Sequence, residues 1–265
     1  SLPQKLNSKR RSQMETCIYK DTWEKIKGFQ SWRQIIKSLQ WVEEDLSAFY
    51  EFGVYTGKST VEILDAFKEA GKEISIVYGF DSFEGLPDRV EEERKEAIER
   101  CGKYQWNAGD FNSHEWHGVE NAKEHLETVF DTYLDTKVEF IEGWYENTLN
   151  KETVEKHSMP PALFVDIDVD VYSSCVEVLD FIFQNGIVVP GTILGFDDWG
   201  GTPEWKSMED GGPKALKQTI EKYDIELQQI MQWGTAYPHV AAAFLVTKVD
   251  GIDCGYKYEN TFMIG

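Results

Sequence analysis

Short runs of hydrophobic residues alternate along this chain with segments whose apolar residues recur at helical spacing. Five apolar runs of strand length are AFYEFGV (48–54), ISIVYGF (74–80), VEFIEG (138–143), ALFVDI (162–167) and TILGFDD (192–198). The first and fourth runs are each followed by a segment of helical period. Continuous apolar strands that alternate with helices are typical of a parallel sheet covered on both faces.

Two of these helices have recognisable ends. The first follows the run at 48–54, with Ser59 or Thr60 expected as its N-cap and Gly71 as its end. The second follows the run at 162–167 and is expected to be capped by a serine. The sequence therefore predicts a repeated order of strand, turn and helix.

The two ends of the chain depart from this order. Residues 225–234 and 241–249 are apolar runs joined by TAYPHV, which is too short for a helix and predicts an antiparallel hairpin. Residues 21–40 have apolar positions at helical spacing. We therefore expect an α/β domain over 46–265, with a mostly parallel sheet of seven strands and helices on both faces, preceded by a helical extension at 1–45.

Composition narrows the class of partner. The 265 residues are 41% hydrophobic and 14% aromatic, which suits one globular domain with a sizeable core. A net charge of −20 repels nucleic acid and anionic membrane. The four cysteines form no CxxC or zinc pattern, and no apolar run approaches the ~18 residues of a membrane span. We expect a cytoplasmic protein that binds neither nucleic acid nor membrane.

Three aspartates occupy alternate positions in FVDIDVDVYSS: Asp166, Asp168 and Asp170. On a straight strand all three side chains would point to the same face, which no apolar core could accommodate. The strand is therefore expected to end among them, with at least one carboxylate facing a cation. In such sheets ligands bind at the carboxyl ends of the strands.

The first strand leads into a glycine motif, Glu51-x-Gly53-x-x-x-Gly57. A dinucleotide-binding fingerprint would need glycine where Tyr55 and Lys58 stand, so a nicotinamide or flavin cofactor is disfavoured. The long glycine-rich loop of a Walker motif is also missing. The motif is either a tight turn between strand and helix or a place where the backbone approaches a cofactor.

Two further positions have both a functional and a structural interpretation. Asp81, at the end of the second strand, is placed to accept both hydroxyls of a ribose, or it caps the turn before Gly85 and Pro87. Trp144, after Gly143 at the end of the third strand, can lie against an adenine ring or belong to the core.

The motifs EFGVYTGKST, FDSFEGLPD, EGWYENTL, DIDVDVYSS and GTILGFDDWGG occur in this order between about residues 50 and 201. Together they resemble the macrocin O-methyltransferase family, metal-dependent enzymes that methylate deoxysugar hydroxyls on macrolides and related glycosides. The resemblance implies a Rossmann-like class I methyltransferase fold that uses S-adenosylmethionine. It also implies a magnesium (or manganese) ion held by Asp168, Asp197 and Asp198, with Asp170 on the second aspartate of the family's D-x-D-x-Y pattern.

The cofactor-binding residues that follow from the resemblance and the strand ends are Glu51, Gly53, Tyr55, Thr56, Gly57, Ser59, Thr60, Asp81, Ser82, Gly143 and Trp144. Asp166 is grouped with them, although the family usually has a non-acidic residue there and its role stays open. Asp197-Asp198 has a structural alternative as a turn pair before the glycine-rich loop.

The expected chemistry is transfer of a methyl group to a sugar oxygen. Magnesium takes six oxygen ligands, so three carboxylates leave room for two vicinal hydroxyls, one of which the ion would acidify. Candidates for the catalytic base are Asp168, His114 and His117. Either histidine can equally be structural.

The two histidines belong to a long insertion, residues 88–135, that also carries Tyr104, Trp106, Phe111 and Trp116. It is predicted to be a lid that stacks on sugar faces, or else a helical surface excursion. The glycine-rich loop at 199–214 is expected to flank the acceptor pocket.

The preferred function is a metal-dependent O-methyltransferase that acts on a sugar or glycosylated natural product and assembles as a dimer or larger homo-oligomer. One alternative is a sugar-nucleotide transferase that holds a diphosphate through a metal; it predicts basic residues near the site. Another is a non-catalytic binding module on the same fold.

Overall fold

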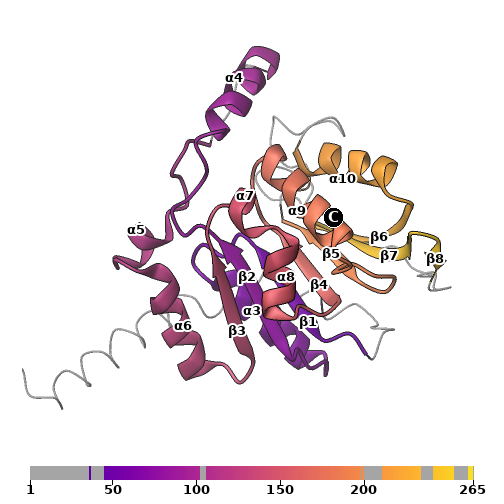
Figure 1. Ribbon diagram of the computed structural model, residues 1–265, viewed down its shortest axis with the longest axis horizontal. Helices are drawn as coiled ribbons and strands as arrows, with labels where there is room; N and C mark the ends of the chain where they lie inside the picture. The colour runs from indigo at the N-terminus through magenta and orange to yellow at the C-terminus, as the bar shows by residue number, and fades with distance from the viewer. Residues whose placement is uncertain are drawn as a thin grey trace, which may run out of the picture.

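The computed structural model describes Ile36 and Trp199 and the ranges 45–101, 106–197, 211–233, 241–253 and 262–264. The predicted N-terminal extension therefore lies almost entirely outside the described residues. Figure 1 shows one sheet at the centre with helices packed on both of its faces. In the described part of the chain, none of the helices has the length and hydropathy that crossing a membrane requires.

Five parallel strands form one half of the sheet, in the order β3-β2-β1-β4-β5. Their bounds are β1 (Ala48–Phe52), β2 (Ile76–Asp81), β3 (Lys137–Glu142), β4 (Ala162–Ile167) and β5 (Ile193–Phe196). Each lies within or next to one of the five predicted runs. The order of the strands reverses between β1 and β4, the point at which ligands bind in sheets of this kind.

The other half of the sheet contains the predicted hairpin. β7 (Ala241–Val249) is antiparallel to both β5 and β6 (Ile225–Trp233). The mostly parallel seven-stranded sheet with an antiparallel C-terminal hairpin is thus confirmed. Two short strands were not predicted: β8 (Ile252–Asp253) pairs with β7, and β9 (Phe262–Ile264) pairs with β6.

Alternation along β1 distributes its side chains between the two layers of helices. Phe49 packs with Phe164 of β4 and joins the cluster that contains α3 (Lys58–Glu69). On the opposite face, Phe52 packs edge-on against Phe181 of α9 (Tyr172–Gln184). The cluster on the α9 face also includes residues of α10 (Gly211–Lys222). Glu51, between Phe49 and Phe52, is thereby directed to the α3 face.

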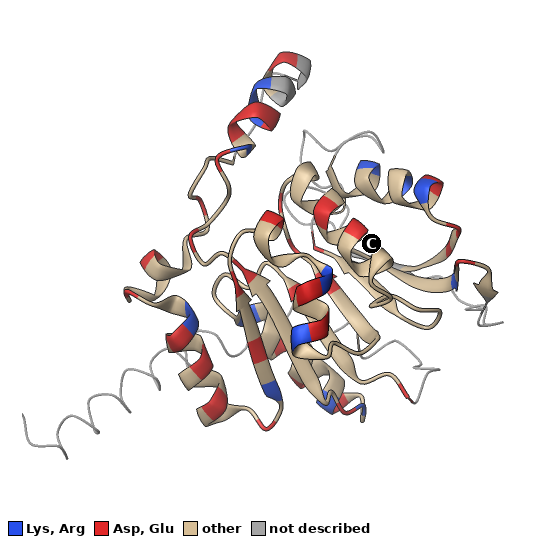
Figure 2. Cartoon of the chain, viewed as in Figure 1, with Lys and Arg blue, Asp and Glu red and all other residues tan. Residues whose placement is uncertain are grey.

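The segment predicted as an insertion, 88–135, contains three helices with different surroundings. α4 (Val90–Cys101) projects from the body of the molecule, and α5 (Ser113–His117) is short. By contrast, α6 (Ala122–Tyr133) packs on β3, where Phe130 meets Phe140. Its last third thus belongs to the packed body, while α4 is the exposed part. Figure 2 marks acidic residues on both α4 and α6 in red.

Two expected helix caps were wrong. The N-cap of α3 is Gly57, not Ser59 or Thr60, and that of α9 is Val171, not a serine. The hydroxyl groups of Ser59 and Thr60 instead donate hydrogen bonds to Glu51. The remaining helices of this part, α7 (Tyr145–Thr148) and α8 (Lys151–His157), follow β3 and connect it to β4.

Candidate active site

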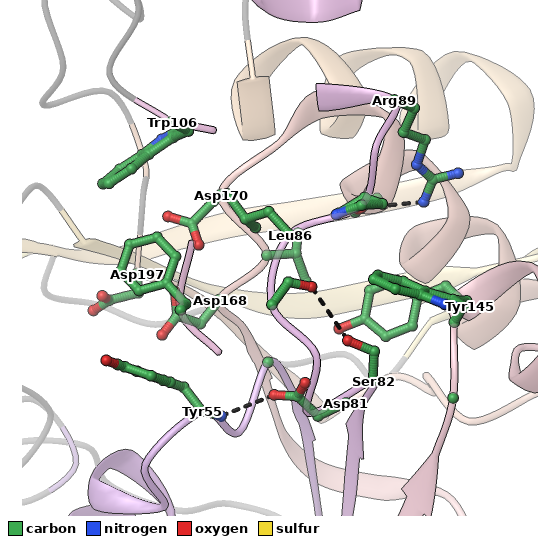
Figure 3. Close-up of a pocket in the computed structure, with 18 residues that line it drawn as sticks. Tyr55, Asp81, Ser82, Leu86, Arg89, Trp106, Tyr145, Asp168, Asp170 and Asp197 are labelled. Atoms are coloured by element: carbon green, nitrogen blue, oxygen red, sulfur yellow. Dashed lines mark hydrogen bonds between the residues drawn. The ribbon is translucent and has the colours of Figure 1, made fainter. Parts of the chain in front are cut away.

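A cavity of about 230 Å³ lies at the carboxyl ends of the parallel strands, where the strand order reverses. Residues that follow each of β1, β2, β3, β4 and β5 line it (Figure 3). The predicted site residues among its lining are Gly53, Tyr55, Asp81, Ser82, Gly143, Trp144, Asp168 and Asp197. Further lining residues include Leu86, Arg89, Trp106, Phe111, Tyr145, Asp170 and Ser174.

Gly53 stands where three strand ends meet. Its amide donates to the carbonyl oxygen of Phe80 at 3.0 Å, and the amide of Asp168 donates to the carbonyl oxygen of Phe52 at 2.9 Å. A Cβ atom at position 53 would lie 1.8 Å from the carbonyl oxygen of Asp168, and φ is +92°. Only glycine fits, because the backbone that follows β4 passes directly beside this position. The close approach at Gly53 is therefore to the protein's own chain.

Glu51 ties the start of α3 to β1. Its carboxyl group is fully buried and accepts hydrogen bonds from Ser59 Oγ, at 2.6 Å, and from Thr60 Oγ1. Burial raises the pKa of Glu51 to about 7, although the two hydroxyl groups act in the opposite direction. None of these three predicted cofactor-binding residues lines the cavity. They hold the start of α3 against β1. Thr56 and Gly57, also predicted, lie outside the lining as well.

Asp81 lines the cavity and also organises the loop after β1. Its Oδ2 accepts from the amides of Val54 at 2.7 Å and Tyr55 at 2.8 Å, and its Oδ1 accepts from Phe83 at 2.7 Å. Burial raises the pKa of Asp81, while the amides counteract that shift. Because each carboxylate oxygen has two lone pairs, the two amides occupy Oδ2, and a ligand would be accepted at Oδ1.

The end of the cavity between Tyr55 and Trp106 is acidic. Asp168, Asp170 and Asp197 lie between these two rings in Figure 3. Asp170 adopts a φ of +58°, an uncommon conformation for a residue other than glycine. The strand ends at Ile167, as the three alternating aspartates predicted. Asp198, the third expected metal ligand, lies outside the described residues.

The described residues contain no group of three His, Cys, Asp or Glu side chains arranged to hold a metal ion. The donors that face this end of the cavity are carboxylate oxygens, the ligand type that magnesium and manganese prefer. The chemistry of the donors thus fits such an ion, with the neighbour of Asp197 needed to complete the predicted set.

Asp166 is separated from the cavity. It belongs to β4, is fully buried, and neither of its carboxyl oxygens has a hydrogen-bond partner. Burial, followed by the negative charges of Glu51 and Asp197, raises the pKa of Asp166 well above its usual range. The neutral form of Asp166 is thereby favoured, and its position gives no support to the predicted place among the cofactor-binding residues.

The two histidines proposed as bases do not line the cavity. His114 uses its Nδ1 to accept a hydrogen bond from the amide of Ala122, at 3.1 Å, where α6 begins. The ring of His117 lies 5.2 Å from that of His125. Of the three proposed bases, only Asp168 faces the cavity.

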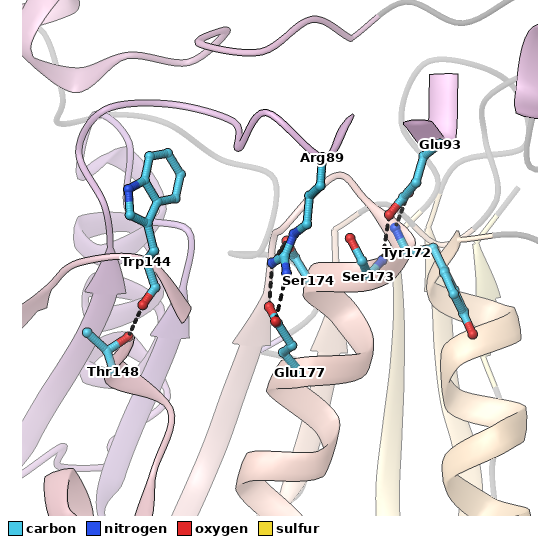
Figure 4. Close-up of polar contacts among 8 residues, drawn as sticks. All are labelled: Arg89, Glu93, Trp144, Thr148, Tyr172, Ser173, Ser174 and Glu177. Atoms are coloured by element: carbon cyan, nitrogen blue, oxygen red, sulfur yellow. Dashed lines mark hydrogen bonds and ion pairs between the residues drawn. The ribbon is translucent and has the colours of Figure 1, made fainter. Parts of the chain in front are cut away.

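Trp144 and Gly143 reach the cavity from the end of β3. The amide of Gly143 donates to the carbonyl oxygen of Asp81 at 2.9 Å, which holds these two strand ends together. The indole of Trp144 lines the cavity, while its carbonyl accepts from Thr148 Oγ1 at 3.1 Å at the start of α7 (Figure 4).

Arg89 and Tyr145 line the cavity but were not assigned from sequence. Arg89 donates to Glu177 of α9 through both terminal nitrogens, with Nη1 to Oε1 at 2.7 Å, and its Nη2 also donates to Ser174 Oγ at 3.2 Å (Figure 4). The hydroxyl of Tyr145 donates to the carbonyl oxygen of Phe80 at 3.5 Å. Tyr145 stands within the motif EGWYENTL, so it could have been assigned to the site from the sequence. No motif or spacing in the sequence indicated Arg89.

Comparisons with known proteins agree with these features. The sequence profile of the macrocin-O-methyltransferase (TylF) family matches residues 26–224. A curated relative is the 8-demethyl-8-(2,3-dimethoxy-alpha-L-rhamnosyl)-tetracenomycin-C 4'-O-methyltransferase of Streptomyces olivaceus, 26% identical over 152 residues, which are 56% of this chain. The matched part spans about half, 51%, of that relative's length.

Among solved structures, the O-methyltransferase NovP has a TM-score of 0.52 and 21% identity, with 82% of this chain and 78% of NovP covered. CalS11, a calicheamicin methyltransferase, has a TM-score of 0.51 and 17% identity, with 88% of this chain and 79% of CalS11 covered. These two structures establish the fold alone. Because the family profile matches about three quarters of the sequence, the chain belongs to the macrocin-O-methyltransferase (TylF) family.

Proposed function

We propose that this protein transfers a methyl group from S-adenosylmethionine to a hydroxyl of a sugar or glycosylated natural product. The observation that carries the proposal is the division of one cavity into two ends (Figure 3). Asp81, Ser82 and Tyr145 lie at one end, and three carboxylates lie at the other. Family membership supports methyl transfer, and the position at the strand-order reversal supports a nucleoside-containing cofactor.

The first end has groups that suit S-adenosylmethionine. The Oδ1 atom of Asp81 can accept from a ribose hydroxyl, and the indole of Trp144 offers a flat apolar surface for adenine. Gly53 and Tyr55 would border the amino-acid part. The loop that carries these groups would be fixed by the hydrogen bonds of Glu51 with Ser59 and Thr60, which do not contact the cofactor themselves.

The acidic end suits a metal ion and a hydroxyl. Asp168 and Asp197 would hold magnesium or manganese, together with Asp198, the next residue in the sequence and the third member of the predicted set. When bound, such an ion lowers the pKa of a coordinated hydroxyl and so makes the oxygen a better nucleophile. Asp168 is also the proposed base that faces the cavity, so it can hold the hydroxyl proton.

The acidic lining weakens the alternative of a sugar-nucleotide transferase. A diphosphate needs basic partners, whereas the cationic side chain among the described lining residues is Arg89, which is engaged by Glu177. A non-catalytic binding module is disfavoured because three carboxylates are held in one place, one of them at a positive φ. Such an arrangement is costly unless it has a use.

The test is direct. The protein is incubated with S-adenosylmethionine, magnesium and a panel of glycosides, and S-adenosylhomocysteine and methylated sugars are detected by mass spectrometry. Product is expected with magnesium or manganese and none in EDTA. Failure of calorimetry to detect S-adenosylhomocysteine binding would refute the cofactor assignment, and full turnover in EDTA would refute the metal.

A further inference from the structure

Four aromatic rings form a row that leads from the cavity to the surface. Ring centroids are 5.0 Å apart for Trp106 and Phe111, 5.4 Å for Phe111 and Tyr55, and 5.7 Å for Tyr55 and Trp116. The first three residues line the cavity, whereas Trp116 lies on α5 beyond them and is 47% exposed. We call these four residues the aromatic row.

The row is held in place by strained backbone and by polar contacts. Tyr55 and Phe111 adopt φ values of +46° and +65°, which bulky side chains rarely take and which therefore require support. Support comes from Asp81, which binds the amide of Tyr55, and from the buried Ser113, whose hydroxyl donates to the carbonyl oxygen of Tyr55 at 2.7 Å. Ser113 begins α5, so this contact fixes Trp116 relative to the cavity.

The row lies beside the acidic end. In Figure 3 the three carboxylates stand between Tyr55 and Trp106, so a hydroxyl presented to them brings the rest of its molecule next to these rings. The indole of Trp116, with Lys58 Nζ 5.1 Å from its ring centroid, continues the surface outward. Large exposed apolar side chains of the described residues include Ile98, Ile220 and Ile252, none of which lines the cavity or packs on a ring that does.

We infer that Trp116 and Tyr55 form an outer subsite for a planar aromatic aglycone attached to the sugar that is methylated. The inference rests on the proposed function. A flat ring can stack on the exposed indole and gain from the neighbouring tyrosine edge and lysine charge. Trp116 itself does not line the cavity, so it is available to a group that extends from the sugar toward the surface. The substrate would then be supplied by a glycosyl transfer reaction onto an aromatic acceptor, which must precede methylation.

The test compares pairs of glycosides with the same sugar, a methyl glycoside and its 4-methylumbelliferyl counterpart, for rhamnose, fucose and glucose. Affinity is measured by calorimetry with S-adenosylhomocysteine and magnesium present. In at least one pair the aryl glycoside is expected to bind about two- to tenfold more tightly, the range of one aromatic contact. In Trp116→Ala this ratio should fall to about one, and in Trp116→Phe it should be largely kept.

Ile220→Ala is the matched control, because Ile220 is 39% exposed on α10 and remote from the row. The inference is overturned if the two members of every pair bind wild-type protein equally, if no aryl glycoside binds, or if the ratio survives in Trp116→Ala. These measurements need no turnover, so they can fail while methyl transfer succeeds. The reverse result, a preference for aryl glycosides without methyl transfer, would support the subsite and refute the proposed function.

Discussion

Glu51 and Asp166 are register partners on the adjacent parallel strands β1 and β4, and both carboxyl groups are fully buried. Glu62 of α3, also buried, lies on the same face of the sheet. Burial, followed by the negative charges of Glu51, Asp197 and Glu62, raises the pKa of Asp166. The fold thus favours the neutral forms of Glu51 and Asp166.

This arrangement predicts that stability falls as pH rises. The pKa of Glu51 is about 7 in the folded protein and 4.5 when unperturbed, so the folded state binds more protons between these values. Stability present below about pH 4.5 is therefore lost as pH rises through 7, by on the order of 3 kcal/mol. Urea unfolding at pH 5, 6, 7 and 8 measures it. Glu51→Gln should show a weaker dependence, while the exposed Glu221→Gln keeps the wild-type one; equal slopes for all three would contradict the prediction.

Asp81→Ala is expected to impair both folding and cofactor binding. The sequence alone suggested a loss of cofactor affinity in an intact fold, but three backbone amides depend on this carboxylate. We now expect a loss of at least about 2 kcal/mol in unfolding free energy, together with about 1.5–3 kcal/mol in S-adenosylhomocysteine affinity. Glu84→Ala, an exposed carboxylate of the same loop, is the control. Wild-type stability of Asp81→Ala would show that the loop does not need the group.

Asp168→Asn and Asp197→Asn should separate the two ends of the cavity. Loss of a carboxylate that holds the ion should cut methyl transfer by orders of magnitude. S-adenosylhomocysteine affinity should change little, because the sulfonium is itself cationic and is expected to lie away from the metal. Turnover and calorimetry are measured on the same preparations. A parallel collapse of cofactor affinity would place these carboxylates in the cofactor pocket.

Glu93→Ala is expected to destabilise the start of α9, the helix whose Glu177 holds Arg89. The carboxylate of Glu93 on α4 accepts from the amides of Tyr172, at 3.0 Å, and Ser173, at 2.9 Å, and so does the work of a helix cap for α9 (Figure 4). Losing such a cap costs about 1 kcal/mol. Thermal unfolding should show the loss in Glu93→Ala but not in the exposed Glu92→Ala. Identical melting of the two variants would argue against the contact.

Much of the fold could be predicted from local sequence patterns. Continuous apolar runs of strand length are typical of strands that are buried on both faces of a parallel sheet. β4 coincides with the apolar run predicted at 162–167, and its end at Ile167 lies among the three aspartates, as their spacing predicted. The helix caps were missed for two different reasons: α3 begins at Gly57 without a side-chain cap, and the acceptor for the first amides of α9 comes from another segment. Glu51 draws the hydroxyl groups of α3 toward the sheet, and Glu93 reaches α9 from a segment about 80 residues earlier.

The site was predictable where a residue lies directly at a strand end, as Asp81, Trp144 and Asp168 do. Arg89 was not, because its place depends on a partner on α9 that no local motif records. His114 and His117 were proposed from residue type alone, and the path of α5 directs them elsewhere. The helical extension at 1–45, the lid, the homo-oligomer and the cytoplasmic location stay predictions.

The close contact between Gly53 and the backbone of Asp168 couples the cofactor end of the cavity to the acceptor end. The loop expected to border the cofactor lies so close to the backbone of Asp168, expected to face the acceptor, that a Cβ atom at position 53 would overlap its carbonyl oxygen. Any side chain at position 53 would displace both at once. Evolution can therefore retune cofactor or acceptor preference through Tyr55, Trp116 or Asp197, whereas position 53 offers no gradual route to either.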